Sequence, residues 1–130
     1  MLTDNEMDTS HIIYNDNEVQ IKPKMIFKDT LENISTFIRK NLKYPQGTLK
    51  MSLTGEVKLS FVVEPTGRIT NIKVLKSLGG GATNEAIRLL VLSQWKPAKK
   101  DNKKVRVAKT FEVNFNLTND SGINYVPTSY

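Results

Sequence analysis

The stretch that decides the fold runs from Val57 to Glu64 and reads Val-Lys-Leu-Ser-Phe-Val-Val-Glu. Apolar side chains recur at every second position, which is the period of a β-strand that buries one face. The next three residues, 65–67, read Pro-Thr-Gly. Proline presets the backbone of a turn and glycine accepts a positive φ, so this segment predicts a hairpin that leads into a second strand over 68–76.

Two helices are predicted on either side of this hairpin. The first begins at Asp29, with Glu32 three residues later as in a capping box, and ends by about Lys43, ahead of a proline. The second follows three consecutive glycines, is expected to be capped by Thr83 and runs to about Gln94. Its expected inward stripe comprises Ala86, Leu89, Leu90 and Ser93.

A third and longest strand is predicted from Val105 to Leu117, where only Lys109 interrupts an apolar face. In the second strand, a change of parity predicts a bulge near Asn71. The whole pattern indicates an α+β fold in which a three-stranded antiparallel sheet carries two helices packed on one face. Such a sheet has two edges, and a long strand at an edge needs an explanation because its backbone groups are open to a partner.

Composition excludes several kinds of active site. The chain has 130 residues, 38% of them hydrophobic, which is enough for one modest core. It lacks cysteine, so it has no disulfide, no cysteine-based metal site and no thiol nucleophile. Its single histidine, His11, lies in a polar leader, which argues against Ser-His catalysis and a multi-histidine metal site. We therefore expect a protein that is not an enzyme and binds no metal or cofactor.

Charge is distributed unevenly along the chain. The net charge is +6, yet residues 1–20 hold five acids and no lysine or arginine. We predict a flexible acidic leader over 1–18, a folded domain over 19–118 and a flexible tail over 119–130. The sequence contains no apolar run long enough to suggest a membrane span.

The strongest charge feature is a basic run over 96–109, which holds seven bases and one acid. A solvated basic loop is the first interpretation, a surface for an acidic partner the second, and nucleic-acid binding the third. Phe111 and Phe115 are assigned to the core face, so they provide no stacking platform beside the charges. Trp95, just before the run, is interpreted as a core or seam residue whose N–H is satisfied locally.

Taken in order, these motifs resemble the TonB C-terminal domain family, in the form common among Bacteroidetes. The resemblance covers roughly residues 19–118 and is carried by the segments 37–45, 55–63, 67–77, 85–88, 95–98 and 111–117. Within them, the family motif residues are Tyr44, Pro45, Gly55, Gly67, Trp95 and Pro97.

The resemblance implies a periplasmic, peptide-binding domain of a TonB-like energy transducer. Such a domain pairs with an extended segment of TonB-dependent outer-membrane receptors and uses no cofactor. Transducers of this family also carry an inner-membrane helix and a Pro-rich spacer, neither of which occurs in these 130 residues. Through that missing N-terminal part, the full-length protein would be tethered to the inner membrane and would contact inner-membrane motor proteins.

We expect the partner peptide to add to the edge of the last strand by β-augmentation. The residues expected at this site are Lys104, Arg106, Ala108, Lys109, Thr110, Glu112 and Asn114, whose cations would favour an acidic peptide. A second interpretation is a regulatory or interaction domain of a membrane sensor or peptidase-like protein, in which the same edge pairs with a second copy to form a homodimer.

Nucleic-acid binding is predicted to be weak and independent of base sequence, because neither stacking aromatics nor a groove-entering helix accompany the bases over 96–109. Fluorescence titration with short DNA and RNA at physiological salt measures this. Submicromolar, sequence-selective binding would contradict the peptide-binding interpretation.

Overall fold

The computed structural model describes residues 6–29 and 31–116. Its elements in chain order are β1 (Ile13–Tyr14), the 3₁₀ helix η1 (Asp16–Glu18), β2 (Lys24–Met25), α1 (Ile34–Asn41), α2 (Gln46–Lys50), β3 (Gly55–Val63), β4 (Ile69–Lys76), α3 (Ala82–Leu92), β5 (Trp95–Lys96), β6 (Ala98–Lys100) and β7 (Lys103–Phe115). The predicted tail over 119–130 lies outside the described residues.

The described residues form two compact units, and β3, β4 and β7 each contribute to both. The first unit also contains β1, η1, β2, β5 and β6, and the second contains the three α-helices.

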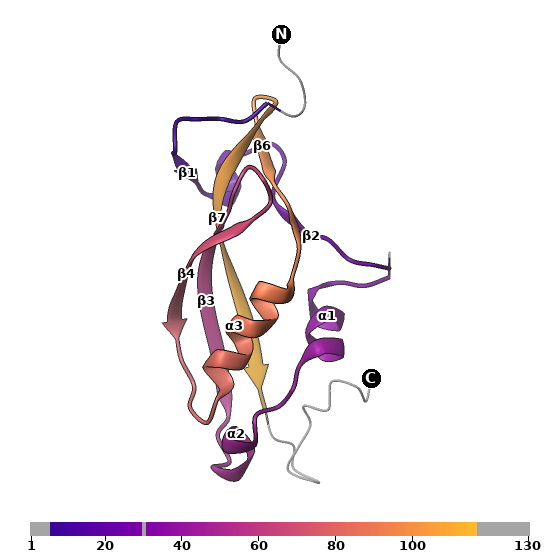
Figure 1. Cartoon of the computed structure of the whole chain (residues 1–130), viewed down its shortest axis with the longest axis vertical. Helices are drawn as coiled ribbons and strands as arrows, with labels where there is room; N and C mark the ends of the chain where they lie inside the picture. Colours follow the sequence, from indigo (N-terminus) through magenta and orange to yellow (C-terminus); the bar gives the residue numbers. More distant parts are fainter. Residues whose placement is uncertain (1–5, 30, 117–130) are drawn as a thin grey trace. The chain divides into compact units, whose positions relative to one another are not determined.

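In the part of the chain that the structure describes, the main sheet has five strands rather than the three that were predicted, and Figure 1 shows how they are arranged. Its order is β1-β7-β3-β4, and β6 also pairs with β7. The prediction of a purely antiparallel sheet was wrong, because β1 runs parallel to β7. The additional strands are only two or three residues long, so they carry too little periodicity to be recognised in the sequence.

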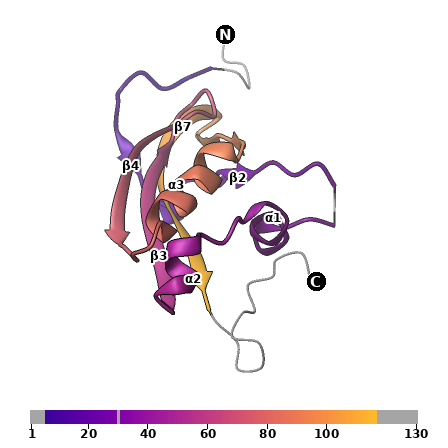
Figure 2. The same ribbon diagram turned by 60° about the horizontal axis from the view of Figure 1, so that its bottom comes forward.

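Packing along β3 follows the predicted alternation except at Val62, which was expected on the solvated face and is buried. Val57 and Leu59 are buried in the second unit, and Phe61 and Val63 are buried in the first. In the second unit, α3 lies across one face of β3 and β7 and buries the predicted residues Ala86, Leu89 and Leu90 (Figures 1 and 2). The helix layer differs from the prediction of two helices: α1 buries no residue fully, and the short α2 was not predicted.

Both helix starts use capping contacts that differ from the predicted ones. Helix α1 begins after Asn33, which exchanges hydrogen bonds with Thr36: the Thr36 N–H donates to Asn33 Oδ1 at 3.0 Å, and the Asn33 N–H donates to Thr36 Oγ1 at 2.7 Å. Asp29 instead closes a turn by accepting from the Leu31 N–H at 3.0 Å. At α3, the Thr83 hydroxyl bonds with both backbone groups of Leu78. The prediction that Asp29 and Thr83 cap the helices was therefore wrong, because each side chain instead makes hydrogen bonds within the turn that precedes its helix.

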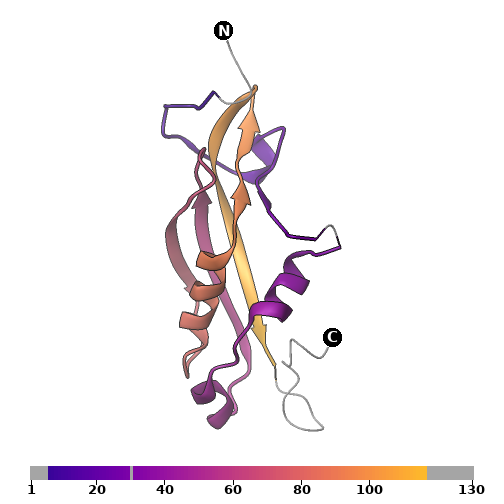
Figure 3. The same cartoon turned by 45° about the vertical axis from the view of Figure 1, so that its right-hand side comes forward.

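Part of the basic run forms a hairpin, which corrects the prediction of a basic loop. Strand β6 pairs with the start of β7 in the register Ala98 with Val105 and Lys100 with Lys103 (Figure 3). The two residues between the strands, Asp101 and Asn102, have φ values of 52° and 67°. Two successive positive φ values are typical of a type I′ turn, in which Asp and Asn are favoured. The Asp-Asn pair is the signal that could have predicted this hairpin.

Trp95 lies in the core of the first unit, as predicted, with 5% of its surface exposed. Its Nε1–H donates to Ser93 Oγ at 2.8 Å, and its ring meets Phe61 edge to face at 5.2 Å between centroids. The turn at Gly67, with a φ of 88°, approaches Trp95 so closely that a Cβ there would lie 2.7 Å from the Trp95 carbonyl oxygen. The predicted local hydrogen bond and the family motif glycine both serve this packing.

Replacing Trp95 by Ala should lower the free energy of unfolding by roughly 3–5 kcal/mol, the range for deleting a large buried aromatic. Trp95→Phe keeps an aromatic ring against Phe61 and should cost less. Urea denaturation followed by circular dichroism measures both changes. A loss below about 1 kcal/mol for Trp95→Ala, the level of surface substitutions, would show that the ring is not part of the core.

Candidate functional site

In the second unit, Glu85 ties the segment before α2 to α3. Its carboxylate accepts hydrogen bonds from the Lys43 N–H at 2.6 Å and from Arg88 at 2.8 and 2.7 Å. Arg88 also donates to the Asn41 carbonyl at 2.7 Å. Burial raises the pKa of Glu85, but the hydrogen bonds from Arg88 and Lys43 outweigh it, so the net pKa lies below its ordinary value. These contacts therefore stabilise the negative charge of Glu85, which contributes to the stability of the fold.

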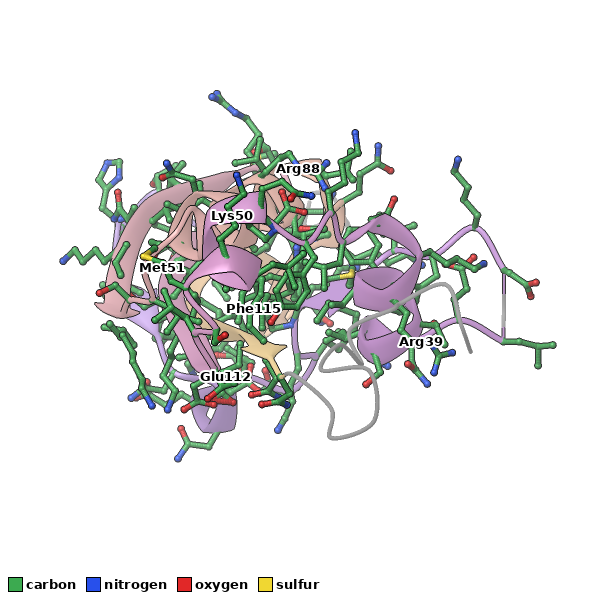
Figure 4. All side chains as sticks on the ribbon, turned by 90° about the horizontal axis from the view of Figure 1, so that it is seen from below. Arg39, Lys50, Met51, Arg88, Glu112 and Phe115 are labelled. Carbon is green, nitrogen blue, oxygen red and sulfur yellow. The ribbon has the colours of Figure 1, made fainter. Side chains whose placement is uncertain are left out.

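This anchor fixes the motif residues around the end of β7. Tyr44 packs edge to face on Phe115, with 5.4 Å between ring centroids and an interplanar angle of 78°. Figure 4 shows Phe115 inside this unit, with Glu112 nearer its periphery. Pro45 is the residue before α2, and Gly55 begins β3 with a φ of 144°. The motif residues of this unit thus shape a core and turns rather than a reactive cluster.

Strand β7 divides most of its side chains between two environments. The odd-numbered apolar residues Val105, Val107, Phe111, Val113 and Phe115 are buried, whereas Ala108, Thr110, Glu112 and Asn114 are exposed. No described residue of β7 has a positive φ, and from Val105 to Phe115 the half-buried Lys109 is the one odd-numbered residue that is not buried. The strand therefore has a regular backbone in which N–H and C=O groups of alternate residues point to the same edge.

Contacts made by Lys104 identify which residues point away from β3. Its N–H donates to the Glu6 carbonyl at 2.8 Å, and its carbonyl accepts from the Asp8 N–H at 2.9 Å. Further along, β1 pairs in parallel with β7 in the register Ile13 with Arg106 and Tyr14 with Val107. In the sheet order, β1 and β3 flank β7 on opposite sides. We call the side opposite β3 the outer edge.

By the same alternation, the backbone groups of Ala108, Thr110, Glu112 and Asn114 also point to the outer edge. Strand partners in the described part of the chain cover this edge only as far as Val107. The region from Ala108 to Asn114 thus combines exposed side chains with outward backbone groups.

Two of the three cations expected to attract an acidic peptide are already paired within the chain. Arg106 donates to both Glu64 oxygens at 2.9 and 3.0 Å and to the His11 carbonyl at 3.1 Å. Lys109 Nζ lies 3.0 Å from Asp16 Oδ2. Within this chain they hold the leader and the hairpin turn, and their role toward a partner stays a prediction. Glu112, likewise, pairs with Lys58 across the sheet at 3.3 Å.

Glu64 is the acid at the centre of these contacts. Burial raises the pKa of Glu64. The hydrogen bonds from Arg106 and Thr70 and the nearby charges of Arg106 and Arg68 lower it by more, so the net pKa lies below its ordinary value of 4.5. Sequence reasoning assigned Glu64 only to the hairpin. Its pairing with Arg106, 42 residues away, carries no local signal.

Leader residues that cover the first part of the edge were also missed. The short apolar run Ile12-Ile13-Tyr14, set among polar residues, is the one signal that could have indicated a strand there.

The described residues contain no group of three or more His, Cys, Asp or Glu side chains placed to hold a metal ion. Within the same ranges, none of the helices combines the length and apolar character that a membrane span requires.

Comparison with known proteins gives one family and two solved structures. Residues 40–117 match the family model of the C-terminal region of the Gram-negative bacterial TonB protein. The solution structure of the Helicobacter pylori TonB C-terminal domain is 25% identical, covers 67% of this chain and 79% of that chain, and gives a TM-score of 0.49. That of the Pseudomonas aeruginosa TonB C-terminal domain is 22% identical, covers 75% and 88%, and gives 0.47. Comparison with curated protein sequences found no match.

The Glu64–Arg106 pair predicts a dependence of stability on pH. A depressed folded pKa means that the stabilisation is fully present above pH 4.5 and is lost as the pH falls through the folded pKa. Glu64→Gln should therefore unfold at a lower temperature than the wild type at pH 7, and the difference should shrink in acid. Thermal unfolding followed by circular dichroism at pH 7 and at about pH 3 measures this.

Glu112→Gln is the matched control, since Glu112 pairs with a lysine on the exposed face of the sheet. Such pairs contribute about 0–1 kcal/mol, so this variant should differ little from the wild type at either pH. A difference for Glu64→Gln that is the same at both pH values would contradict the assignment.

Proposed function

The chain belongs to the family of Gram-negative bacterial TonB protein C-terminal domains, and from this premise we propose that it is the periplasmic, peptide-binding domain of a TonB-like energy transducer. It would bind an extended segment of a TonB-dependent outer-membrane receptor along the outer edge of β7. Binding alone would couple the receptor to inner-membrane motor proteins, which the full-length protein would contact through a part outside this sequence. This function needs neither catalysis nor a cofactor.

The observation that carries the proposal is the pairing of the chain's own leader with the same edge. Residues Met7 and Ile13–Tyr14 pair with β7 in parallel at Lys104 and at Arg106–Val107. An edge that already accepts one added strand has the twist and backbone geometry that β-augmentation requires. The four outward residues beyond Val107 would offer the same surface to a separate peptide.

Length and charge of this surface suggest which peptide it would take. From Ala108 to Asn114 the strand extends about 20 Å, at about 3.3 Å per residue, which suits an extended segment of about seven residues. Arg106 and Lys109 are paired internally and Glu112 is balanced by Lys58, so charge would contribute little to the choice of peptide. Affinity would come from backbone hydrogen bonds, and specificity would be modest.

The opposite edge of the sheet, formed by β4, is less suited to this role. Asn71 has a φ of 55°, so the backbone of β4 departs from regular extended geometry near its middle. Lys73 and Lys76 are exposed on the same strand. Irregular backbone and lysines are the usual means by which proteins prevent an edge strand from pairing. On β7, the region from Ala108 to Asn114 has no residue with a positive φ, and its one lysine, Lys109, is half-buried and paired with Asp16.

Thr110→Pro tests the proposal directly, because it removes one outward N–H while leaving the hydrogen bonds to β3 intact. Peptide affinity should fall by about tenfold, since one backbone hydrogen bond contributes about 0.5–1.5 kcal/mol and the proline ring also obstructs the approach. Isothermal titration with peptides from periplasm-facing segments of TonB-dependent receptors of the same organism measures the change.

Thr110→Ala is the matched control, because it shortens the same side chain but keeps the N–H, and it should bind the peptides as the wild type does. Circular dichroism of both variants checks the fold. Equal affinity for folded Thr110→Pro and Thr110→Ala would exclude the outer edge as the site. Sedimentation of the wild type without peptide shows in addition whether two copies of the chain pair with each other.

A further inference from the structure

The structure sorts the seven bases of the basic run into two groups. Four are within ion-pair distance of acids: Lys100 with Asp101 at 3.5 Å, Lys103 with Glu6 at 3.9 Å, Arg106 with Glu64 at 2.9 Å and Lys109 with Asp16 at 3.0 Å. No carboxylate of the described residues forms an ion pair with any of the remaining three, Lys96, Lys99 and Lys104.

The three unpaired lysines line one cavity in the first unit, of about 500 Å³, together with Lys22 and Lys24. Its other lining residues are Ile21 and Pro97, so no acid of the described residues takes part. We call this cavity the lysine groove. Five positive charges around one small cavity create a strongly positive local potential that attracts an anion.

Strand pairing fixes this concentration of charge. Lys24 lies directly opposite Lys96 in the pair formed by β2 and β5, and Lys99 lies directly opposite Lys104 in the pair formed by β6 and β7. Ile21 and Lys99 exchange backbone hydrogen bonds at 3.1 and 2.9 Å, which joins the two pairs into one surface. Like charges in directly opposite positions destabilise a sheet. Two such pairs in one groove are unfavourable for the fold alone, and a bound anion would relieve both.

We propose that the lysine groove binds a ligand that carries two or more phosphate groups. All five cations are lysines and none is an arginine. Lysine acts as a compact point charge that binds phosphate, whereas the planar fork of arginine pairs with carboxylate or phosphate in two hydrogen bonds. Five closely spaced point charges match the dense charge of such a ligand better than the more widely spaced carboxylates of an acidic peptide. The groove lies apart from the peptide site, because of the outer-edge residues only Lys104 lines it.

The test compares two double variants with the same change of net charge. Lys24→Gln/Lys96→Gln removes both members of the lysine pair between β2 and β5, and Lys73→Gln/Lys76→Gln removes two exposed lysines of β4. Isothermal titration with tripolyphosphate should show binding to the wild type and to the β4 variant, and at least about tenfold weaker binding to the groove variant. The groove variant should also melt no lower than the wild type, since it loses like-charge repulsion.

Two further titrations identify the ligand class and its source. Hexaglutamate should bind more weakly than tripolyphosphate, and equal affinity would overturn the phosphate assignment. Vesicles containing cardiolipin, whose head group carries two phosphates, separate the sources: retention of the wild type but not of the groove variant indicates lipid head groups, and no retention indicates a soluble phosphorylated ligand. Equal loss of tripolyphosphate binding in both variants would indicate diffuse charge and overturn the site, as would no binding to the wild type at about 1 mM ligand.

Discussion

The two-residue period of β7 is the constraint on which the rest of the structure depends. Because β7 is extended from Lys103 to Phe115, each residue that buries its side chain also directs its backbone groups inward, to β6 at the start of the strand and to β3 further along, and each exposed residue directs them outward. The core therefore holds the odd-numbered residues in place, and the even-numbered ones become an edge without any further device. A single bulge in this strand would exchange the two sets and abolish the outer edge.

The leader gives this edge its present form. Its acids and backbone carbonyls take up the cations and N–H groups at the start of β7, through Glu6, His11 and Asp16. The charge asymmetry of the sequence thus has a structural result. The acidic leader pairs with Lys103 and Lys109 of the basic run, whereas Lys96, Lys99 and Lys104 line the lysine groove. Peptide binding and anion binding, as proposed, would use different surfaces because the leader separates the charges in this way.

The sequence predicted the long elements and missed the short ones. Strand β3, strand β7 and the buried face of α3 follow from clear periodicity, and the resemblance to the TonB C-terminal family is confirmed by the family match. Its Bacteroidetes form stays a prediction. Strands β1, β2, β5 and β6 have two or three residues each, so their pairing depends on contacts distant in sequence.

The same limit applies to the site. That the even-numbered residues of β7 share one face was readable from the alternation, as was their exposure. The alternation could not predict three contacts, because none of them lies within a turn or a strand period. These are the contacts of Arg106 with Glu64, of Lys109 with Asp16 and of the leader with Lys104. Capping residues show a related ambiguity: Asp29 and Asn33 are both good caps, and only the packed structure selects Asn33.

Hydrogen exchange of individual amides, measured by NMR with and without a receptor peptide, distinguishes binding at the outer edge from binding elsewhere. The peptide should slow exchange at Thr110, Glu112 and Asn114, whose N–H groups point to the outer edge, while Phe111 and Val113 should be slow in both states because they bond to β3. Slowing that is confined to β4, or that is absent along the whole of β7, would contradict binding at the outer edge.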